Sequence, residues 1–81
     1  MVFIRVQSVK ALPEWKLLLT FNNGEEKIFD TSLYLNKGYF TELQNISYFN
    51  SVVSRNGTVE WPNGQDFCPD TLYLKSISAK S

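Results

Sequence analysis

Histidine is absent from the 81 residues, and cysteine occurs once, at Cys68. Without histidine the chain lacks the side chain that most often moves protons near neutral pH, and no cysteine–histidine catalytic pair can form. A lone cysteine cannot close an intramolecular disulfide, on which secreted domains of this size usually depend. We therefore expect a cytoplasmic protein that is not an enzyme and holds no cofactor or metal.

An excess of charge of either sign is also missing, because eight basic residues balance eight acidic ones. Nucleic-acid binding usually requires a surplus of cations, so nucleic acid is an unlikely partner. No apolar run approaches the roughly 20 residues that span a bilayer, and Met1 opens no signal-peptide pattern, so we expect no membrane association. Low net charge and a small core favour association with another small protein or with a second copy of the chain.

Glycine is sparse, and its four positions are too widely separated for a phosphate-binding loop. Two of them, at Asn23-Gly24 and Asn56-Gly57, follow asparagine and lie between runs with strand character. Asparagine and glycine both tolerate the positive φ that tight hairpins require. The sequence therefore predicts a β-hairpin at each site.

Alternating apolar residues define the strands around these turns. They predict strands over Val2–Val9, Trp15–Phe21 and Glu25–Asp30, and a second hairpin from Ser51–Arg55 and Thr58–Trp61. This gives an α+β fold with an antiparallel sheet of about five strands, in which a three-stranded N-terminal meander is joined by the second hairpin.

Short helices are expected between and after the strands. From Thr31 to Asn50 the apolar spacing is mixed, which favours short helical turns packed over the sheet, and Pro69 suits the first turn of a helix that runs to Leu74. The chain should form a single domain over residues 1–81, with residues 76–81 frayed.

Cys68 and three acidic residues are the remaining candidates for chemistry. We expect Cys68 to be buried as a small hydrophobe, since free cysteine is among the most buried residue types. Glu60, Asp66 and Asp70 surround a loop, where converging carboxylates could bind a metal or small ligand or support an enzyme. We favour structural roles in solvation, loop hydrogen bonding and helix stabilisation.

Aromatic residues gather in the middle of the chain. We assign Phe40 and Phe49 to the core, whereas the tyrosines divide evenly between packing and an interface, because each has a polar hydroxyl. The candidate binding surface combines these tyrosines with the stretch after the second hairpin: Tyr34, Tyr39, Tyr48, Glu60, Trp61, Asn63, Asp66 and Asp70.

The chain resembles a bacterial family known as domain of unknown function 2442. The likeness rests on Leu18–Glu25, Phe29-Asp30 and above all Gly57–Tyr73, which contains the pattern Trp-Pro-Asn-Gly-x-Asp followed by Pro-Asp-x-Leu-Tyr. The resemblance implies a small stand-alone bacterial domain without established activity, encoded beside a partner in an arrangement like a toxin–antitoxin pair. Some members carry a helix-turn-helix domain, which we do not expect in this protein.

These observations predict a non-enzymatic protein-interaction or regulatory module, the antitoxin-like half of a bacterial gene pair. A ligand-binding protein or enzyme centred on the three acidic residues and a nucleic-acid accessory protein are the alternatives.

Overall fold

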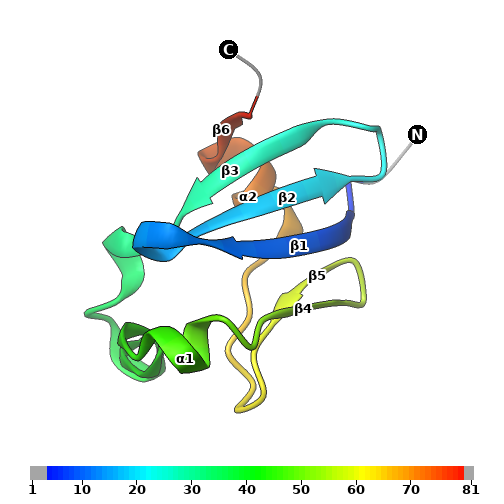
Figure 1. Ribbon diagram of the computed structural model, residues 1–81. Coiled ribbons are helices and arrows are strands. Elements are labelled where there is room, and N and C mark those ends of the chain that lie inside the picture. Colours follow the sequence, from blue (N-terminus) through cyan, green and yellow to red (C-terminus); the bar gives the residue numbers. More distant parts are fainter. Residues whose placement is uncertain (1–3, 80–81) are drawn as a thin grey trace.

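A four-stranded antiparallel sheet forms the upper half of the molecule in Figure 1. The computed structural model describes residues 4–79, apart from the side chain of Tyr39. The strands lie in the order β1-β2-β3-β6, with bounds β1 Val6–Leu12, β2 Lys16–Phe21, β3 Glu26–Asp30 and β6 Ile77–Ser78. The predicted N-terminal meander is thereby confirmed, and a short C-terminal strand extends it.

The first strand is shifted toward the C-terminus relative to its prediction. β1 begins at Val6 and continues to Leu12, whereas Val2 and Phe3 lie outside the described residues. The 3-10 turn η1, Pro13–Trp15, follows directly, and Glu14 and Trp15 adopt left-handed φ values of 64° and 59°. The Trp15 indole N–H donates to the Leu43 carbonyl at 2.7 Å, which holds this turn in place. Trp15 therefore precedes β2 rather than starting it.

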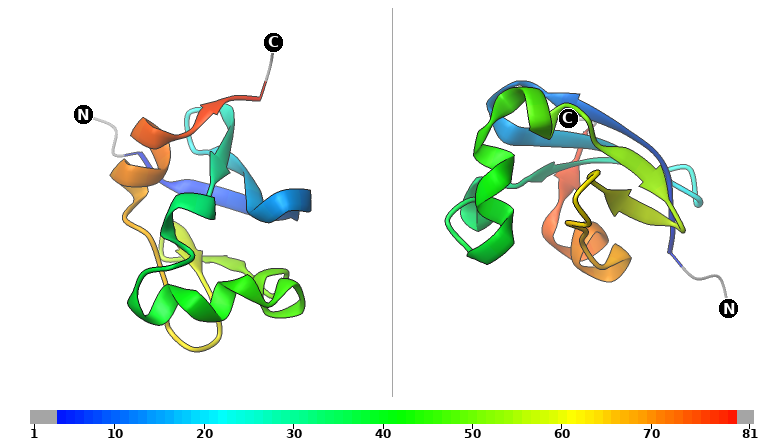
Figure 2. Two further views of the ribbon diagram at one scale, coloured as in Figure 1. Left: turned by 90° about the vertical axis from the view of Figure 1, so that its left-hand side faces the viewer. Right: turned by 90° about the horizontal axis from the view of Figure 1, so that it is seen from below.

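Every second residue of β2 is buried in the core on the inner face of the sheet, as the alternating sequence pattern predicts. Leu17, Leu19 and Phe21 of β2 are all fully buried, and they share the core with Leu72 of helix α2, Pro69–Lys75. Side chains at every second position of a strand share one face, so the intervening residues of β2 point away from this core. Figure 2 shows α2 on the inner side of the sheet.

The middle of the chain forms the lower half of the molecule. The predicted helical turns are confirmed as η2 Ser32–Tyr34, η3 Gly38–Gln44 and α1 Ile46–Phe49. The predicted second hairpin is confirmed as a two-stranded sheet of β4 Val53–Arg55 and β5 Thr58–Glu60. Asn45 caps α1, because its side-chain oxygen accepts hydrogen bonds from the backbone N–H groups of Ser47 and Tyr48. The fold is thus α+β, as predicted.

The two Asn-Gly turns predicted to form hairpins differ in conformation. Asn56 and Gly57 have φ values of 54° and 79°, as in a two-residue type I′ hairpin. At the first turn, Gly24 has a φ of 87°, while Asn23 is not left-handed, so the expectation of positive φ at both residues is wrong there. The Gly24 N–H instead donates to the Phe21 carbonyl at 2.9 Å, which closes a longer loop with glycine at its last position.

The C-terminal segment is ordered beyond the point where fraying is expected. Ile77 and Ser78 pair with Ile28 and Lys27 of β3, and the Ala79 N–H donates to the Glu26 carbonyl at 3.0 Å. The chain leaves α2 beside the edge of β3. Strand β6 can therefore form there although it has only one apolar residue. Residues 80–81 lie outside the described part of the chain.

Candidate functional site

The stretch after β5 folds as a third hairpin turn rather than an irregular loop. The Trp61 N–H donates to the Gln65 carbonyl and the Gly64 N–H donates to the Trp61 carbonyl, both at 2.9 Å, while Glu60 and Asp66 form an antiparallel bridge. Phe21–Glu25 has the same hydrogen-bond pattern at the β2–β3 turn. The two turns share a five-residue pattern: an aromatic residue, any residue, Asn, Gly, and Glu or Gln. Sequence reasoning overlooked this pattern.

A polar network fastens this turn to the helical layer. The two carboxylate oxygens of Glu42 accept from Asn63 Nδ2 at 2.6 Å and from Gln65 Nε2 at 2.7 Å. The Tyr48 hydroxyl donates to Gln65 Oε1 at 2.5 Å and accepts from the Asn63 N–H at 2.8 Å. Two predicted binding residues, Asn63 and Tyr48, are therefore engaged within the chain. Sequence reasoning missed Glu42, which has no local signature, and Gln65, whose position in the repeated turn pattern it did not recognise.

The aromatic members of the predicted binding surface contribute mainly to packing. Trp61 is only 1% exposed, and its indole N–H donates to the Phe49 carbonyl at 2.9 Å. Tyr34 stacks on Phe29 at 5.7 Å and meets the edge of Phe67 at 5.2 Å between ring centroids. The side chain of Tyr39 lies outside the described part of the structure.

A depression that we call the hairpin hollow lies over the buried Trp61. It has a volume of about 280 Å³ and is lined by Ser51, Val53, Arg55, Glu60, Trp61 and Pro62. Val53 is 46% exposed here, although it is a large apolar residue. The Arg55 guanidinium lies 3.8 Å from a Glu60 carboxylate oxygen, so one ion pair stands beside the apolar surface.

The three predicted acidic residues do not gather at one site. Glu60 and Asp66 are opposite each other in the bridge, whereas Asp70 lines a separate depression of about 250 Å³ with Arg5 and Cys68. Across residues 4–79 no group of three or more histidine, cysteine, aspartate or glutamate residues could hold a metal ion. The acidic cluster therefore stays divided between two surfaces.

Cys68 is exposed, so the prediction of a buried thiol is wrong. Residues alternate in burial from Gln65 to Cys68, with Gln65 and Phe67 buried and Asp66 and Cys68 exposed. In an extended segment neighbouring side chains point to opposite sides. Because Phe67 takes the inward position, Cys68 faces solvent.

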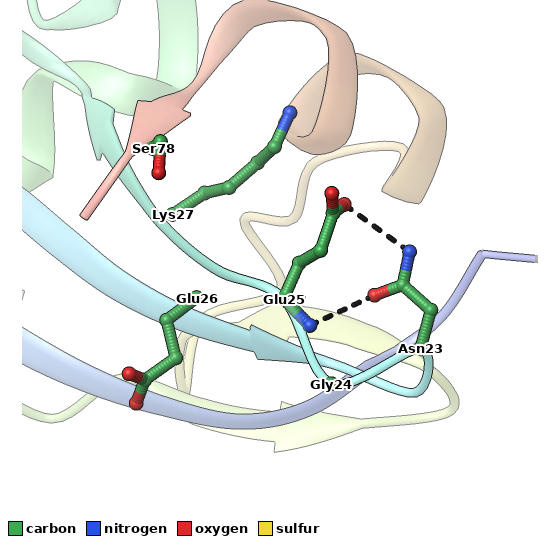
Figure 3. Close-up of a pocket in the computed structure, with 6 residues that line it drawn as sticks. All are labelled: Asn23, Gly24, Glu25, Glu26, Lys27 and Ser78. Atoms are coloured by element: carbon green, nitrogen blue, oxygen red, sulfur yellow. Dashed lines mark hydrogen bonds between the residues drawn. The ribbon is translucent and has the colours of Figure 1, made fainter. Parts of the chain in front are cut away.

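A further depression lies at the β2–β3 turn (Figure 3). It has a volume of about 340 Å³ and is lined by Asn23, Gly24, Glu25, Glu26, Lys27 and Ser78. The hydrogen bond from the Tyr73 hydroxyl, with a second one from Asn23, lowers the pKa of the Glu25 carboxyl group. The same bond to Glu25 raises the pKa of the Tyr73 phenol. The Lys27 amine donates to the Tyr73 carbonyl at 3.0 Å and lies 3.9 Å from the centre of its ring. These internal bonds fit an architectural role for the turn.

The fold and its surface define a small α+β domain with shallow, open depressions. The chain belongs to the family described as protein of unknown function (DUF2442), whose model matches residues 6–78. No curated protein and no solved structure matches the chain. None of the helices within residues 4–79 has the length and apolar character needed to cross a membrane.

Proposed function

We propose that this chain is a non-enzymatic protein-interaction module that binds a partner protein at the hairpin hollow. The observation that carries the proposal is the 46% exposure of Val53 in a concave surface, beside Pro62 and above the buried Trp61. An apolar centre with a charged rim is the usual anatomy of a protein interface.

The polar groups of the hollow suit recognition better than catalysis. Arg55 and Glu60 largely compensate each other's charge, and the Ser51 hydroxyl donates to the Tyr48 carbonyl at 2.5 Å. A nucleophilic serine needs an adjacent base that accepts its proton, whereas a backbone carbonyl only orients the hydroxyl. The ion pair can instead set the register of a partner, because charges at an interface rim confer specificity.

The partner predicted by this surface is a protein segment with an apolar side chain between charged neighbours. The apolar group would cover Val53 and Pro62, while an acidic and a basic group would meet Arg55 and Glu60. Within our proposal the partner is another small bacterial cytoplasmic protein, encoded by the neighbouring gene, and binding regulates it as an antitoxin regulates its toxin.

Co-expression with the neighbouring gene product tests this proposal. The variant Val53→Asp places a charge at the apolar centre, and Leu33→Asp is its matched control, because Leu33 is 78% exposed in η2 and does not line the hollow. In size-exclusion chromatography, the wild-type chain and Leu33→Asp should co-elute with the partner, whereas Val53→Asp should elute separately with an unchanged circular dichroism spectrum. Separate elution of the wild type, or co-elution of Val53→Asp, would contradict the proposal.

A further inference from the structure

The four-stranded sheet has a second face that points away from α2, which we call the outer face. Strand register arranges its side chains in three rows across the sheet. The rows are Leu12, Lys16 and Asp30; then Lys10, Leu18, Ile28 and Ile77; then Ser8, Thr20 and Glu26. The middle row is apolar across three adjacent strands.

Within residues 4–79 no other element covers the outer face. Helix α2 lies on the opposite side of the sheet, and the helical layer lies below the sheet in the view of Figure 1 (Figures 1 and 2). The sheet edges are better protected. At β1, the Val6 N–H donates to the Gly57 carbonyl at 2.8 Å and the Ser54 hydroxyl donates to the Gln7 carbonyl at 3.3 Å. At the other edge, β6 is a strand of only two residues, which leaves little free edge for pairing. A partner is therefore more easily accommodated on the outer face than by adding a strand.

Charge is distributed across the outer face in a self-complementary way. Its lysines, Lys10 and Lys16, lie on β1 and β2, whereas its acidic residues, Glu26 and Asp30, lie on β3. Lys16 of β2 and Asp30 of β3 are neighbours in the strand register of the sheet. Rotation about an axis parallel to the strands between β2 and β3 brings Lys16 of one copy to Asp30 of the other, which is the self-complementarity that a symmetric interface requires. The same rotation places Lys10 opposite Ile77 and Glu26 opposite Thr20.

We propose that two copies of the chain associate through their outer faces, around a two-fold axis that runs parallel to the strands between β2 and β3. This rotation keeps each row in register. It places Leu18 opposite Ile28 of the second copy, and Lys16 opposite Asp30 of the second copy. The four charges then alternate around a square, beside four apolar side chains.

The size of the outer face implies weak association. Strands about 4.8 Å apart and rows about 6.8 Å apart give a face of a few hundred Å², below the roughly 800 Å² that each partner buries in a standard interface. We expect a dissociation constant on the order of 10–100 μM. The dimer should therefore exchange readily and leave the hairpin hollow accessible.

Sedimentation equilibrium with complementary charge reversals tests the proposed geometry. Lys16→Glu makes all four charges of the square negative, and Asp30→Lys makes all four positive, so each variant alone should dimerise about tenfold or more weakly than the wild type. In an equimolar mixture, two negative charges face two positive charges, and dimerisation should be restored. Lys37→Glu is the matched control, because Lys37 is exposed just before η3 and lies in none of the three rows, so this charge reversal should dimerise like the wild type.

Several outcomes would overturn the proposal. A wild-type chain that stays monomeric at concentrations well above the expected dissociation constant would do so without any variant. Unimpaired dimerisation of Lys16→Glu would place the interface elsewhere. If Asp30→Lys does not fold, intermolecular nuclear Overhauser effects between Leu18 and Ile28 in a mixed-label wild-type sample decide the question, and their absence from a dimer refutes the outer-face interface.

Discussion

Replacing Tyr48 by phenylalanine removes a hydroxyl group of α1 that makes two hydrogen bonds to the Trp61–Gln65 turn. This hydroxyl donates to Gln65 at 2.5 Å and accepts from the Asn63 N–H at 2.8 Å. A neutral hydrogen bond contributes about 0.5–1.5 kcal/mol to stability, so the two bonds together amount to about 1–3 kcal/mol. Gln65 is only 1% exposed, so water cannot readily replace the lost donor, which favours the upper half of that range.

Urea unfolding measures this loss directly. Tyr48→Phe should lower the transition midpoint without changing the slope, because the surface exposed on unfolding stays nearly the same. Tyr34→Phe is the matched control, since its hydroxyl makes no hydrogen bond within residues 4–79 and its ring keeps the stacking on Phe29. Equal losses in the two variants, or a loss below about 0.5 kcal/mol in Tyr48→Phe, would refute the role of the network.

Two further predictions concern Cys68 and the acid stability of the fold. Cys68 is exposed, so its thiol should react with an aromatic disulfide reagent in the native protein; a reaction as slow as global unfolding would contradict the exposure. The pKa of Asp30 lies below its usual 3.8 mainly because of the Ser32 N–H, and that of Glu25 lies below 4.5 mainly because of the Tyr73 hydroxyl. A carboxyl group whose pKa is lowered by folding stabilises the folded state at pH values above its ordinary pKa. This stabilisation is lost as the pH falls through the pKa of the folded state, so the unfolding free energy should decrease below about pH 5. Asp30→Asn should flatten this decrease, and an unchanged pH profile would show that Asp30 does not contribute.

The meander and second hairpin could be predicted because their signals are local. The burial of Leu17, Leu19 and Phe21 follows from a period of two, and the Asn56-Gly57 turn needs only residues that accept positive φ. The α2 helix likewise begins at its proline. In each case the sequence pattern and the final packing favour the same structure.

The missed features depend on contacts between distant segments. β6 forms because α2 returns the chain to β3, and Ile77 alone gives no strand pattern. The prediction that Cys68 is buried rests on its residue type alone. Its exposure follows instead from the neighbouring Phe67, which takes the inward position.

The candidate site was located only in part for the same reason. Sequence reasoning selected Glu60 and Trp61, which line the hairpin hollow, but it did not select Val53 or Arg55. Those two residues come from the other strand of the hairpin, and their convergence with Pro62 depends on the turn at Trp61–Gln65. The turn has to be recognised before the hollow can be predicted.

The most direct test of binding at the hairpin hollow is a nuclear magnetic resonance titration of the isotopically labelled chain with the neighbouring gene product. Our account predicts amide shifts concentrated in residues 51–62, with Leu18 and Ile28 on the outer face unaffected at protein concentrations below the dimer dissociation constant. Shifts centred on the outer face or on the β2–β3 turn, or no shifts at a saturating partner concentration, would contradict it.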